Sequence, residues 1–209
     1  MTVAAYAPLQ SLLRDSRLRT EVPLRELTTL RVGGPIDALV ELESEGDLAA
    51  LLEWAGQEGR PWIVLGKGSN LLAPDAGLRG LAIRLGRGLS GFQALGEQGW
   101  VRAGAGLANA AFVSRGRQLG LGGMEYLVAI PGTIGGAVAM NAGAHDGETA
   151  RFLERVRFFE QGRGIVECEA ARFPFAYRES ALRGELGRIV TQAEFRLQAM
   201  APETIRARE

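Results

Sequence analysis

The chain has 209 residues, and its 24 basic and 24 acidic side chains cancel at neutral pH. This length can bury the core of one large domain or two small ones, and the balanced charge, with no basic block interleaved with aromatic residues, argues against a nucleic-acid partner. No segment approaches the roughly 20 consecutive apolar residues of a membrane span, and the N-terminus lacks a secretory signal pattern, so we expect a cytoplasmic protein with no membrane partner.

Residues 1–20 are predicted to form an N-terminal extension that is partly disordered, and we assign no chemistry to it. The first domain is expected at residues 21–88. Its predicted elements are a strand at 38–42, a helix from Ser44 to Gly59, and strands at 62–65 and 81–85. This strand–helix–strand order predicts a small α/β domain with parallel strand pairing.

The second domain is expected at residues 89–200. Its predicted elements are a strand at 100–103, a helix that ends near Gly120, and strands at 156–159, 164–167 and 188–197. This half of the chain is predicted to be α+β, with a mostly antiparallel sheet.

Two glycine-rich segments stand out within these domains. Residues 130–143 read Ile-Pro-Gly-Thr-Ile-Gly-Gly-Ala-Val-Ala-Met-Asn-Ala-Gly, and residues 66–72 read Gly-Lys-Gly-Ser-Asn-Leu-Leu directly after the apolar run 62–65. Glycines let bare backbone approach a ligand, and main-chain N–H groups in such turns often hold phosphate oxygens. Either segment alone is equally well explained as a tight turn that only the fold requires. Two of them in one short chain favour a ligand.

Five motifs occur in an order and spacing that resemble a known family. They are Thr28-Thr-Leu-Arg-Val-Gly-Gly34, Leu65-Gly-Lys-Gly-Ser-Asn-Leu-Leu72, Ile130-Pro-Gly-Thr-Ile-Gly-Gly136, Met140-Asn-Ala-Gly143 and Phe175-Ala-Tyr-Arg-Glu-Ser180. Over roughly residues 21–200 the chain is similar to the UDP-N-acetylenolpyruvoylglucosamine reductases, flavoenzymes of bacterial peptidoglycan synthesis. The resemblance implies an α+β, two-subdomain FAD-binding fold of the vanillyl-alcohol-oxidase type. It also implies FAD as cofactor, NADPH as hydride donor, a UDP-sugar enolpyruvyl ether as substrate, and a monomer.

The resemblance gives the glycine-rich segments a role along the FAD. The residues it implies as cofactor-binding are Gly66, Lys67, Gly68, Ser69, Asn70, Leu71, Ile130, Pro131, Gly132, Thr133, Gly135, Gly136, Ala137, Asn141 and Gly143. The side chains of Ser69 and Asn70 can add hydrogen bonds to phosphate oxygens. Valine at Gly68 or Gly135 is expected to abolish FAD binding and to leave a folded core.

Arg178 matches the catalytic arginine of the family. A permanent cation with a planar donor fork suits the enolate-like charge that builds on the substrate carboxylate. Without the motif, a surface arginine paired with Glu179 would be the better interpretation. Tyr177 is expected to contact the substrate by packing beside it, because an unperturbed phenol is a poor proton donor at neutral pH.

The family has a third domain, which contains a serine in a Gly-Ser-Phe-Phe-Lys-Asn-type motif that protonates the substrate, and a glutamate near its C-terminus. Neither motif is found in residues 1–209, so residues 201–209 are expected to be the start of a missing substrate-binding domain. The chain is then a fragment or a shortened homologue, most similar to the shorter subclass. Two alternatives stay open: a non-catalytic or incomplete FAD-binding module, and another small oxidoreductase of the same fold class.

The single cysteine and single histidine exclude an intramolecular disulfide and a Cys/His metal site. Cys168 lies in a strand-like stretch and is interpreted as a buried, inert thiol rather than a nucleophile. His145 follows the second glycine-rich segment and is interpreted as a solvent-facing loop residue. Covalent flavin attachment and a general-acid role are its alternatives.

Overall fold

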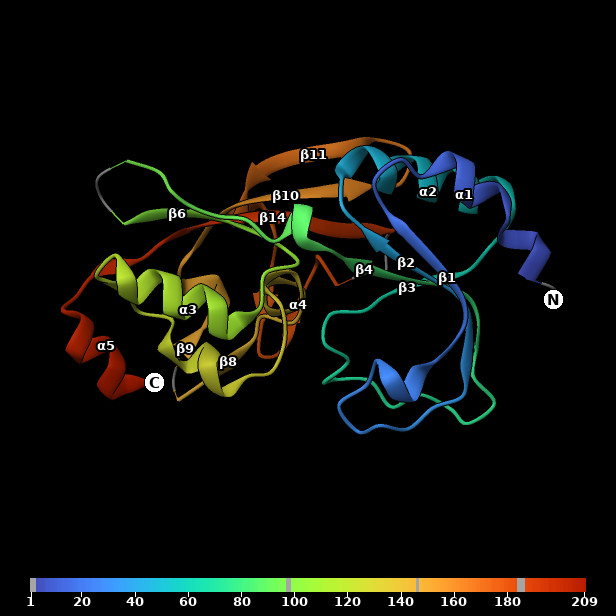
Figure 1. Ribbon diagram of the computed structural model, residues 1–209. Helices are drawn as coiled ribbons and strands as arrows, with labels where there is room; N and C mark the ends of the chain where they lie inside the picture. Colours follow the sequence, from blue (N-terminus) through green and yellow to red (C-terminus); the bar gives the residue numbers. More distant parts are fainter. Residues whose placement is uncertain (1–2, 97–98, 146, 184–186) are drawn as a thin grey trace. The chain divides into compact units, whose positions relative to one another are not determined.

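The computed structural model describes residues 3–96, 99–145, 147–183 and 187–209 (Figure 1). The chain divides into two compact units, Met1–Leu89 and Ser90–Glu209. Each unit is described by itself.

Unit 1 is built on a four-stranded sheet in the order β1-β2-β4-β3. The strands are β1 (Arg17–Pro23), β2 (Pro35–Leu42), β3 (Trp62–Val64) and β4 (Leu78–Leu85). Strand β4 pairs in parallel with both β2 and β3, which confirms the predicted parallel pairing, whereas β1 pairs antiparallel with β2. Strand β1 was not predicted.

Helix α2 (Glu45–Gln57) confirms the predicted helix. The Ser44 side chain accepts a hydrogen bond from the Asp47 N–H at 3.1 Å, as an N-cap residue should. The predicted apolar face is buried and packs on β2. It comprises Leu48, Leu51, Leu52 and Ala55.

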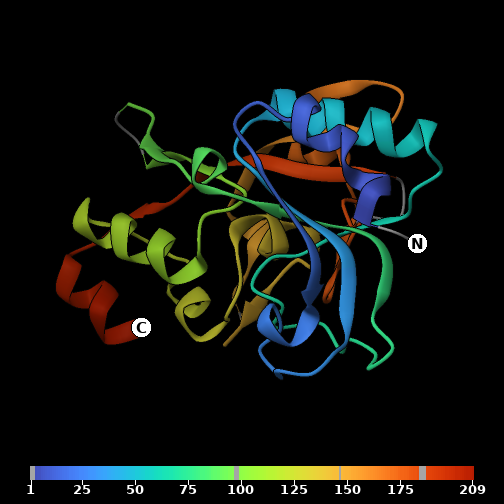
Figure 2. The same cartoon turned by 45° about the vertical axis from the view of Figure 1, so that its right-hand side comes forward.

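The N-terminal segment differs from the expected disordered extension. It forms a 3₁₀ turn (Val3–Tyr6) and helix α1 (Pro8–Leu12), which lies beside α2 (Figure 2). The side chains of Tyr6, Leu9 and Leu13 are buried. The expected boundary at residue 20 therefore falls inside a strand that belongs to the sheet.

Strand β1 forms one outer edge of this sheet and contains an irregularity. Its outward side chains include Arg17, Arg19 and Glu21, and Glu21 has a φ of 54°. No pairing with β2 is made at Glu21, although Thr20 and Val22 on either side are paired. The edge of the sheet is therefore interrupted at this residue.

Unit 2 is built on a five-stranded antiparallel sheet in the order β11-β10-β14-β6-β5, which confirms the predicted mostly antiparallel sheet. Its strands are β5 (Phe92–Ala94), β6 (Trp100–Gly104), β10 (Leu153–Glu160), β11 (Gly164–Glu169) and β14 (Arg188–Arg196). Three two-stranded pairs accompany it. They are β7 (Leu121–Gly122) with β15 (Gln198–Ala199), β8 (Gly143–Ala144) with β9 (Gly147–Glu148), and β12 (Phe175–Ala176) with β13 (Glu179–Ser180).

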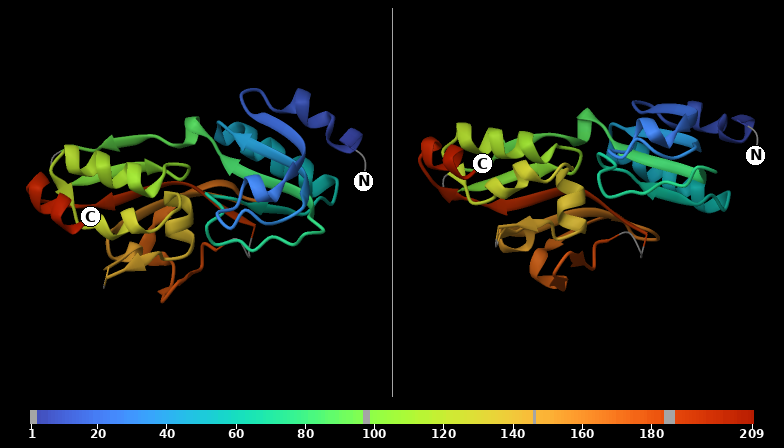
Figure 3. Two further views of the ribbon diagram at one scale, coloured as in Figure 1. Left: turned by 60° about the horizontal axis from the view of Figure 1, so that its bottom comes forward. Right: turned by 90° about the horizontal axis from the view of Figure 1, so that it is seen from below.

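The helices of unit 2 are α3 (Asn109–Gln118), α4 (Ile134–Ala139) and α5 (Pro202–Arg208). The Phe112 ring of α3 meets Phe195 of β14 and Phe92 of β5 at centroid distances of 5.1 and 5.5 Å. Helices α3 and α5 lie side by side (Figure 3). Short 3₁₀ turns complete the two units at Leu24–Glu26, Arg87–Leu89, Glu125–Ala129, Thr149–Arg151 and Ala170–Arg172.

Candidate functional site

The first glycine-rich turn, residues 66–71, leaves the carboxyl end of β3 in unit 1. Gly68 has a φ of 64°, and a Cβ there would lie 2.1 Å from the Leu27 carbonyl oxygen. The Gly68 carbonyl accepts a hydrogen bond from the Thr29 N–H at 3.1 Å. The missing side chain is therefore required by the protein's own packing, and valine at Gly68 would strain this loop before any cofactor is considered. Loss of FAD binding in that variant would therefore not by itself report a cofactor contact at Gly68.

The side chains around this turn face solvent. Those of Lys67, Ser69 and Asn70 are exposed. Apolar side chains are also exposed here: Leu72 follows the turn with 77% of its surface accessible, and Leu30 in the loop bonded to Gly68 has 61%. Polar groups and apolar surface together suit a nucleotide-type ligand.

The second glycine-rich segment, residues 130–143, is anchored to the start of α3 in unit 2. The Asn109 side chain donates to the Ile130 carbonyl at 2.9 Å, and the Asn109 N–H donates to the Gly132 carbonyl at 3.1 Å. The Asn109 Oδ1 atom is buried and has no hydrogen-bond partner among the described residues. Buried polar atoms normally have partners. The sequence did not indicate Asn109, because its hydrogen-bond partners, the Ile130 and Gly132 carbonyls, lie in a distant segment.

Adjacent glycines in α4 have different surroundings. A Cβ on Gly135 would lie 2.9 Å from Ala105 Cβ, and the Gly135 N–H donates to the Ala105 carbonyl at 2.8 Å. Gly136 is exposed, and the nearest atom to a Cβ there is Thr133 Oγ1 at an ordinary 3.7 Å. Gly135 thus packs α4 against the segment after β6, and only Gly136 presents bare backbone outward. Ala137, the next residue, is buried.

Asn141 is 2% exposed and adopts a φ of 41°. Its Nδ2 donates to Glu148 Oε2 at 3.1 Å and to the Ala176 carbonyl at 3.0 Å, and its Oδ1 accepts from the Ala150 N–H at 2.9 Å. Both amide hydrogens are therefore used within the chain. Gly143 also has an internal role, because a Cβ there would lie 2.2 Å from the Gly147 carbonyl oxygen across the β8–β9 pair.

Arg178 and Tyr177 form the two-residue turn of the β12–β13 hairpin. Tyr177 is 86% exposed, Arg178 is exposed with a φ of 58°, and its guanidinium carbon lies 5.3 Å from the Tyr177 ring centroid. Within the part of the chain that the structure describes, no carboxylate forms an ion pair with Arg178, so the alternative pairing with Glu179 is not found. The donor fork is available to a ligand.

Ser180 fixes the second strand of this hairpin. Its hydroxyl donates to the Ala139 carbonyl at the end of α4 at 2.9 Å and accepts from the Leu182 N–H at 3.2 Å. The sequence placed Ser180 in a motif but assigned it no role. Together, Asn141 and Ser180 bring the end of the second glycine-rich segment against the hairpin that carries Arg178.

The other candidate residues from the sequence, His145 and Cys168, make none of the hydrogen bonds described above between the second glycine-rich segment and the hairpin. His145 is exposed, with a φ of 49°, in the turn after β8. Cys168 is half-buried in β11 rather than buried as expected. Burial still raises the pKa of its thiol, which disfavours the reactive thiolate. The described residues contain no cluster of three or more His, Cys, Asp or Glu side chains that could hold a metal. Nor do they contain a helix of the length and apolarity that a bilayer crossing needs.

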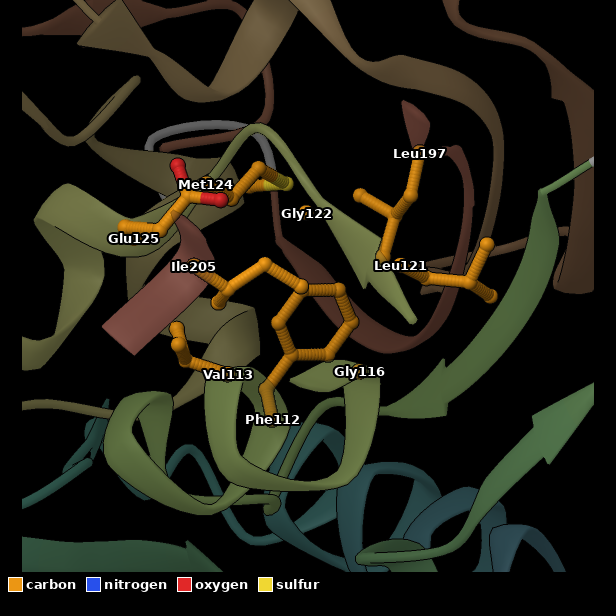
Figure 4. Close-up of a pocket in the computed structure, with 9 residues that line it drawn as sticks. All are labelled: Phe112, Val113, Gly116, Leu121, Gly122, Met124, Glu125, Leu197 and Ile205. Carbon is orange, nitrogen blue, oxygen red and sulfur yellow. The ribbon is translucent and has the colours of Figure 1, made fainter. Parts of the chain in front are cut away.

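A small cavity in unit 2 lies between α3, β7 and α5 (Figure 4). Its volume is about 10 Å³, which is at the lower limit for one water molecule. Ile205 of α5 is fully buried beside Phe112 and Val113. The cavity is a packing gap beneath α5 and too small for a cofactor or substrate.

The chain is similar to known flavin-binding proteins in both sequence and fold. Residues 36–169 match the family described as FAD binding domain. The UDP-N-acetylenolpyruvoylglucosamine reductase of Rubrobacter xylanophilus is 42% identical over 186 residues, which cover 89% of this chain and 62% of that protein. The structure of UDP-N-acetylenolpyruvylglucosamine reductase from Thermus caldophilus matches with a TM-score of 0.78 at 37% identity, over 92% of this chain and 66% of that one.

A more distant structure shows the same fold. The 6-hydroxy-D-nicotine oxidase from Arthrobacter nicotinovorans matches with a TM-score of 0.66 at 16% identity, over 90% of this chain and 43% of that one. The chain spans less than two thirds of the length of these relatives. The expected α+β fold of the vanillyl-alcohol-oxidase type is confirmed. The chain belongs to the FAD binding domain family and is a homologue of UDP-N-acetylenolpyruvoylglucosamine reductase.

Proposed function

We propose that this chain binds FAD without a covalent link and provides the flavin-binding part of an NADPH-dependent reductase. The reaction is reduction of UDP-N-acetylglucosamine enolpyruvate to UDP-N-acetylmuramate, a step in peptidoglycan precursor synthesis. The observation that carries the proposal is the bond from the Asn141 amide to the Ala176 carbonyl. It ties the glycine-rich segment expected to line the cofactor to the hairpin that bears the expected catalytic arginine.

The residues present fit an FAD. The backbone of the 66–71 turn in unit 1 and the backbone of residues 130–137 in unit 2 are each, taken by itself, a candidate contact for the cofactor. Gly136 offers exposed main chain with room for close approach, and Asn109 Oδ1 is a buried acceptor that lacks a partner among the described residues. When bound, FAD supplies the capacity to accept and donate a hydride.

Arg178 would bind the carboxylate of the enolpyruvyl group. Its planar fork of N–H donors matches a carboxylate, and its charge stabilises the negative charge that grows there during reduction. Tyr177 lies beside the guanidinium and would pack against the same group. No residue of this chain is assigned the proton donor's role.

Retention of FAD tests the proposal. Protein refolded with excess FAD and then desalted should keep the visible absorbance of the flavin and should release it on denaturation. A colourless product would contradict the cofactor assignment. Flavin that stays attached after denaturation would instead point to covalent attachment, with His145 as the first residue to examine.

A non-catalytic FAD-binding module is the second candidate, and the match to the FAD binding domain family supports it, because that match requires cofactor binding alone. The FAD-loaded chain is expected to reduce the enolpyruvyl substrate negligibly, because the proton donor is not assigned within it. Sustained substrate-dependent NADPH oxidation by this chain would contradict the non-catalytic module and would show that the chain itself supplies a proton donor.

A further inference from the structure

We infer that Asn141 and Ser180 are positioning residues for Arg178: they hold both strands of the β12–β13 hairpin against the end of α4 and the chain that follows it. The anchoring of the hairpin by these two side chains follows from the hydrogen bonds of the structure alone. Its consequence for catalysis rests on the proposed function, because only there does Arg178 have a substrate.

Asn141 is built into this place rather than left facing a ligand. It is 2% exposed, and its three hydrogen bonds run to two separate pieces of chain, residues 148–150 and strand β12. The bond to the Ala176 carbonyl spans 35 residues and reaches β12 immediately before the turn. Its φ of 41° is a conformation that asparagine tolerates better than most side chains.

Ser180 provides the matching anchor on β13, as the second residue after the turn. Its hydroxyl donates to the Ala139 carbonyl, the last residue of α4, at 2.9 Å. The two anchors therefore flank the turn, one on each strand. Because the turn itself contains only Tyr177 and Arg178, the position of the guanidinium follows from the position of the strand ends.

The hairpin needs these anchors. It has only two residue pairs, Phe175 with Ser180 and Ala176 with Glu179. An isolated two-stranded hairpin is marginally stable at best. A buried side-chain hydrogen bond on each strand therefore decides whether the tip is ordered.

Hydrogen exchange in the 209-residue chain tests the inference, with Asn141→Asp as the main variant. The carboxylate keeps the acceptor used by the Ala150 N–H but cannot donate to the Ala176 carbonyl. Exchange in the 175–180 peptide should rise about tenfold or more, while the β10–β14 amides stay protected. Unchanged exchange in that peptide would overturn the role of Asn141.

The pH dependence of this effect distinguishes a lost donor from general damage. At acidic pH the introduced carboxyl is protonated and can donate again, so the ratio of variant to wild-type exchange should fall between pH 7 and pH 4. The charged groups on the surrounding elements are Glu148 on β9, Arg151 in the 3₁₀ turn, Arg178 in the hairpin turn and Glu179 on β13. Arg151, Arg178 and Glu179 are common to both proteins, but Glu148 lies within hydrogen-bond distance of residue 141 and would repel the new carboxylate. The ratio is therefore measured in a Glu148→Ala background, where this repulsion is absent. If the ratio of variant to wild-type exchange stays high at both pH 7 and pH 4, the loss of a hydrogen-bond donor at residue 141 is not the cause of the effect.

Two further variants complete the test. Glu148→Ala removes the other acceptor of the Asn141 amide and should leave hairpin exchange near the wild-type rate. If Asn141→Asp unfolds unit 2 and exposes the β10–β14 amides as well, Ser180→Ala decides. It removes the bond to the Ala139 carbonyl and the bond from the Leu182 N–H, and it leaves Asn141 intact. It should raise exchange in the hairpin, and no rise would overturn the inference. FAD content is measured separately. Failure to bind FAD would contradict the proposed function, whereas hydrogen exchange in the 175–180 peptide would still test the anchoring of the hairpin.

Discussion

The carboxylate of Asp47 orders the start of unit 1. It accepts hydrogen bonds from the N–H groups of Arg14, Asp15 and Ser16 and from the Ser16 hydroxyl, at 2.6 to 3.0 Å. Burial alone would raise the pKa of Asp47, but these donors outweigh it and hold the pKa below the ordinary value of 3.8. The charged form is therefore the stabilising one.

Asp47→Asn is expected to lower the free energy of unfolding by about 1.5–3 kcal/mol at pH 7, because an amide donor then faces several N–H groups. Since the folded-state pKa is depressed, the stabilisation is present above pH 3.8 and is lost as the pH falls below that value. The difference between wild type and variant should narrow there in urea titrations. Glu53→Gln on the exposed face of α2 is the control, and a pH-independent difference for Asp47→Asn would contradict the prediction.

The two adjacent glycines of α4 provide a matched pair of alanine variants. Gly136→Ala should raise helix stability by up to about 1 kcal/mol and weaken FAD binding, because the methyl group enters space that only a ligand would need. Gly135→Ala should cost about 1–3 kcal/mol through contact with Ala105. Thermal unfolding and flavin titration separate the two effects. Full FAD affinity in Gly136→Ala would mean that the cofactor does not approach this residue.

At the scale of elements, the turn of the β12–β13 hairpin carries Arg178, and a lysine there would separate the effect of positive charge from the effect of the planar guanidinium. In a protein that also carries the third domain, Arg178→Lys keeps the charge and loses the planar fork. Reduction of the enolpyruvyl substrate should slow by roughly a hundredfold or more, while reduction of the flavin by NADPH stays nearly normal. Stopped-flow absorbance measures both. Equal slowing of the two steps would contradict a role confined to the substrate carboxylate.

The elements that the sequence predicted share a long periodic or apolar pattern. Helix α2 combines a serine cap with an apolar face, and β4 is a run of buried residues, so local physics sufficed. Strand β1 reads Arg-Leu-Arg-Thr-Glu-Val-Pro, with one apolar residue in its first five and a left-handed backbone at Glu21, so it lacks the apolar pattern of a strand. The hairpin strands are two residues each, too short to show a period.

Local sequence patterns are also insufficient to assign the roles of the candidate site residues. Glycine-rich composition located both segments but did not separate Gly136, which is open outward, from Gly68 and Gly135, which meet the chain itself. The partner of Asn141 is a carbonyl 35 residues away, and no local pattern encodes such a bond. The sequence nominates candidate residues, but only the fold shows which of them face outward and which pack against the chain itself.

At the scale of the whole molecule, unit 1 has a hydrophobic core of its own. The core cluster includes Val22, Leu24, Ile36, Leu39 and Leu65, all from within Met1–Leu89. A unit of this size can fold alone. Residues 1–89 expressed separately should unfold cooperatively in urea, and Leu39→Ala should lower that stability by about 2–5 kcal/mol. A gradual transition that the variant does not shift would contradict an independent core.

Strand β1 also bears on how this protein behaves at high concentration. An outer strand exposes unpaired N–H and C=O groups that can recruit a strand from another molecule, which is a common start of aggregation. Here the exposed arginines carry charge to that edge, and the left-handed residue Glu21 prevents a long flat run of backbone. We therefore expect the left-handed backbone at Glu21 to hinder pairing with a strand of another molecule. Glu21→Val, which removes a charge and favours extended backbone, should increase aggregation measured by light scattering, and an unchanged signal would contradict this.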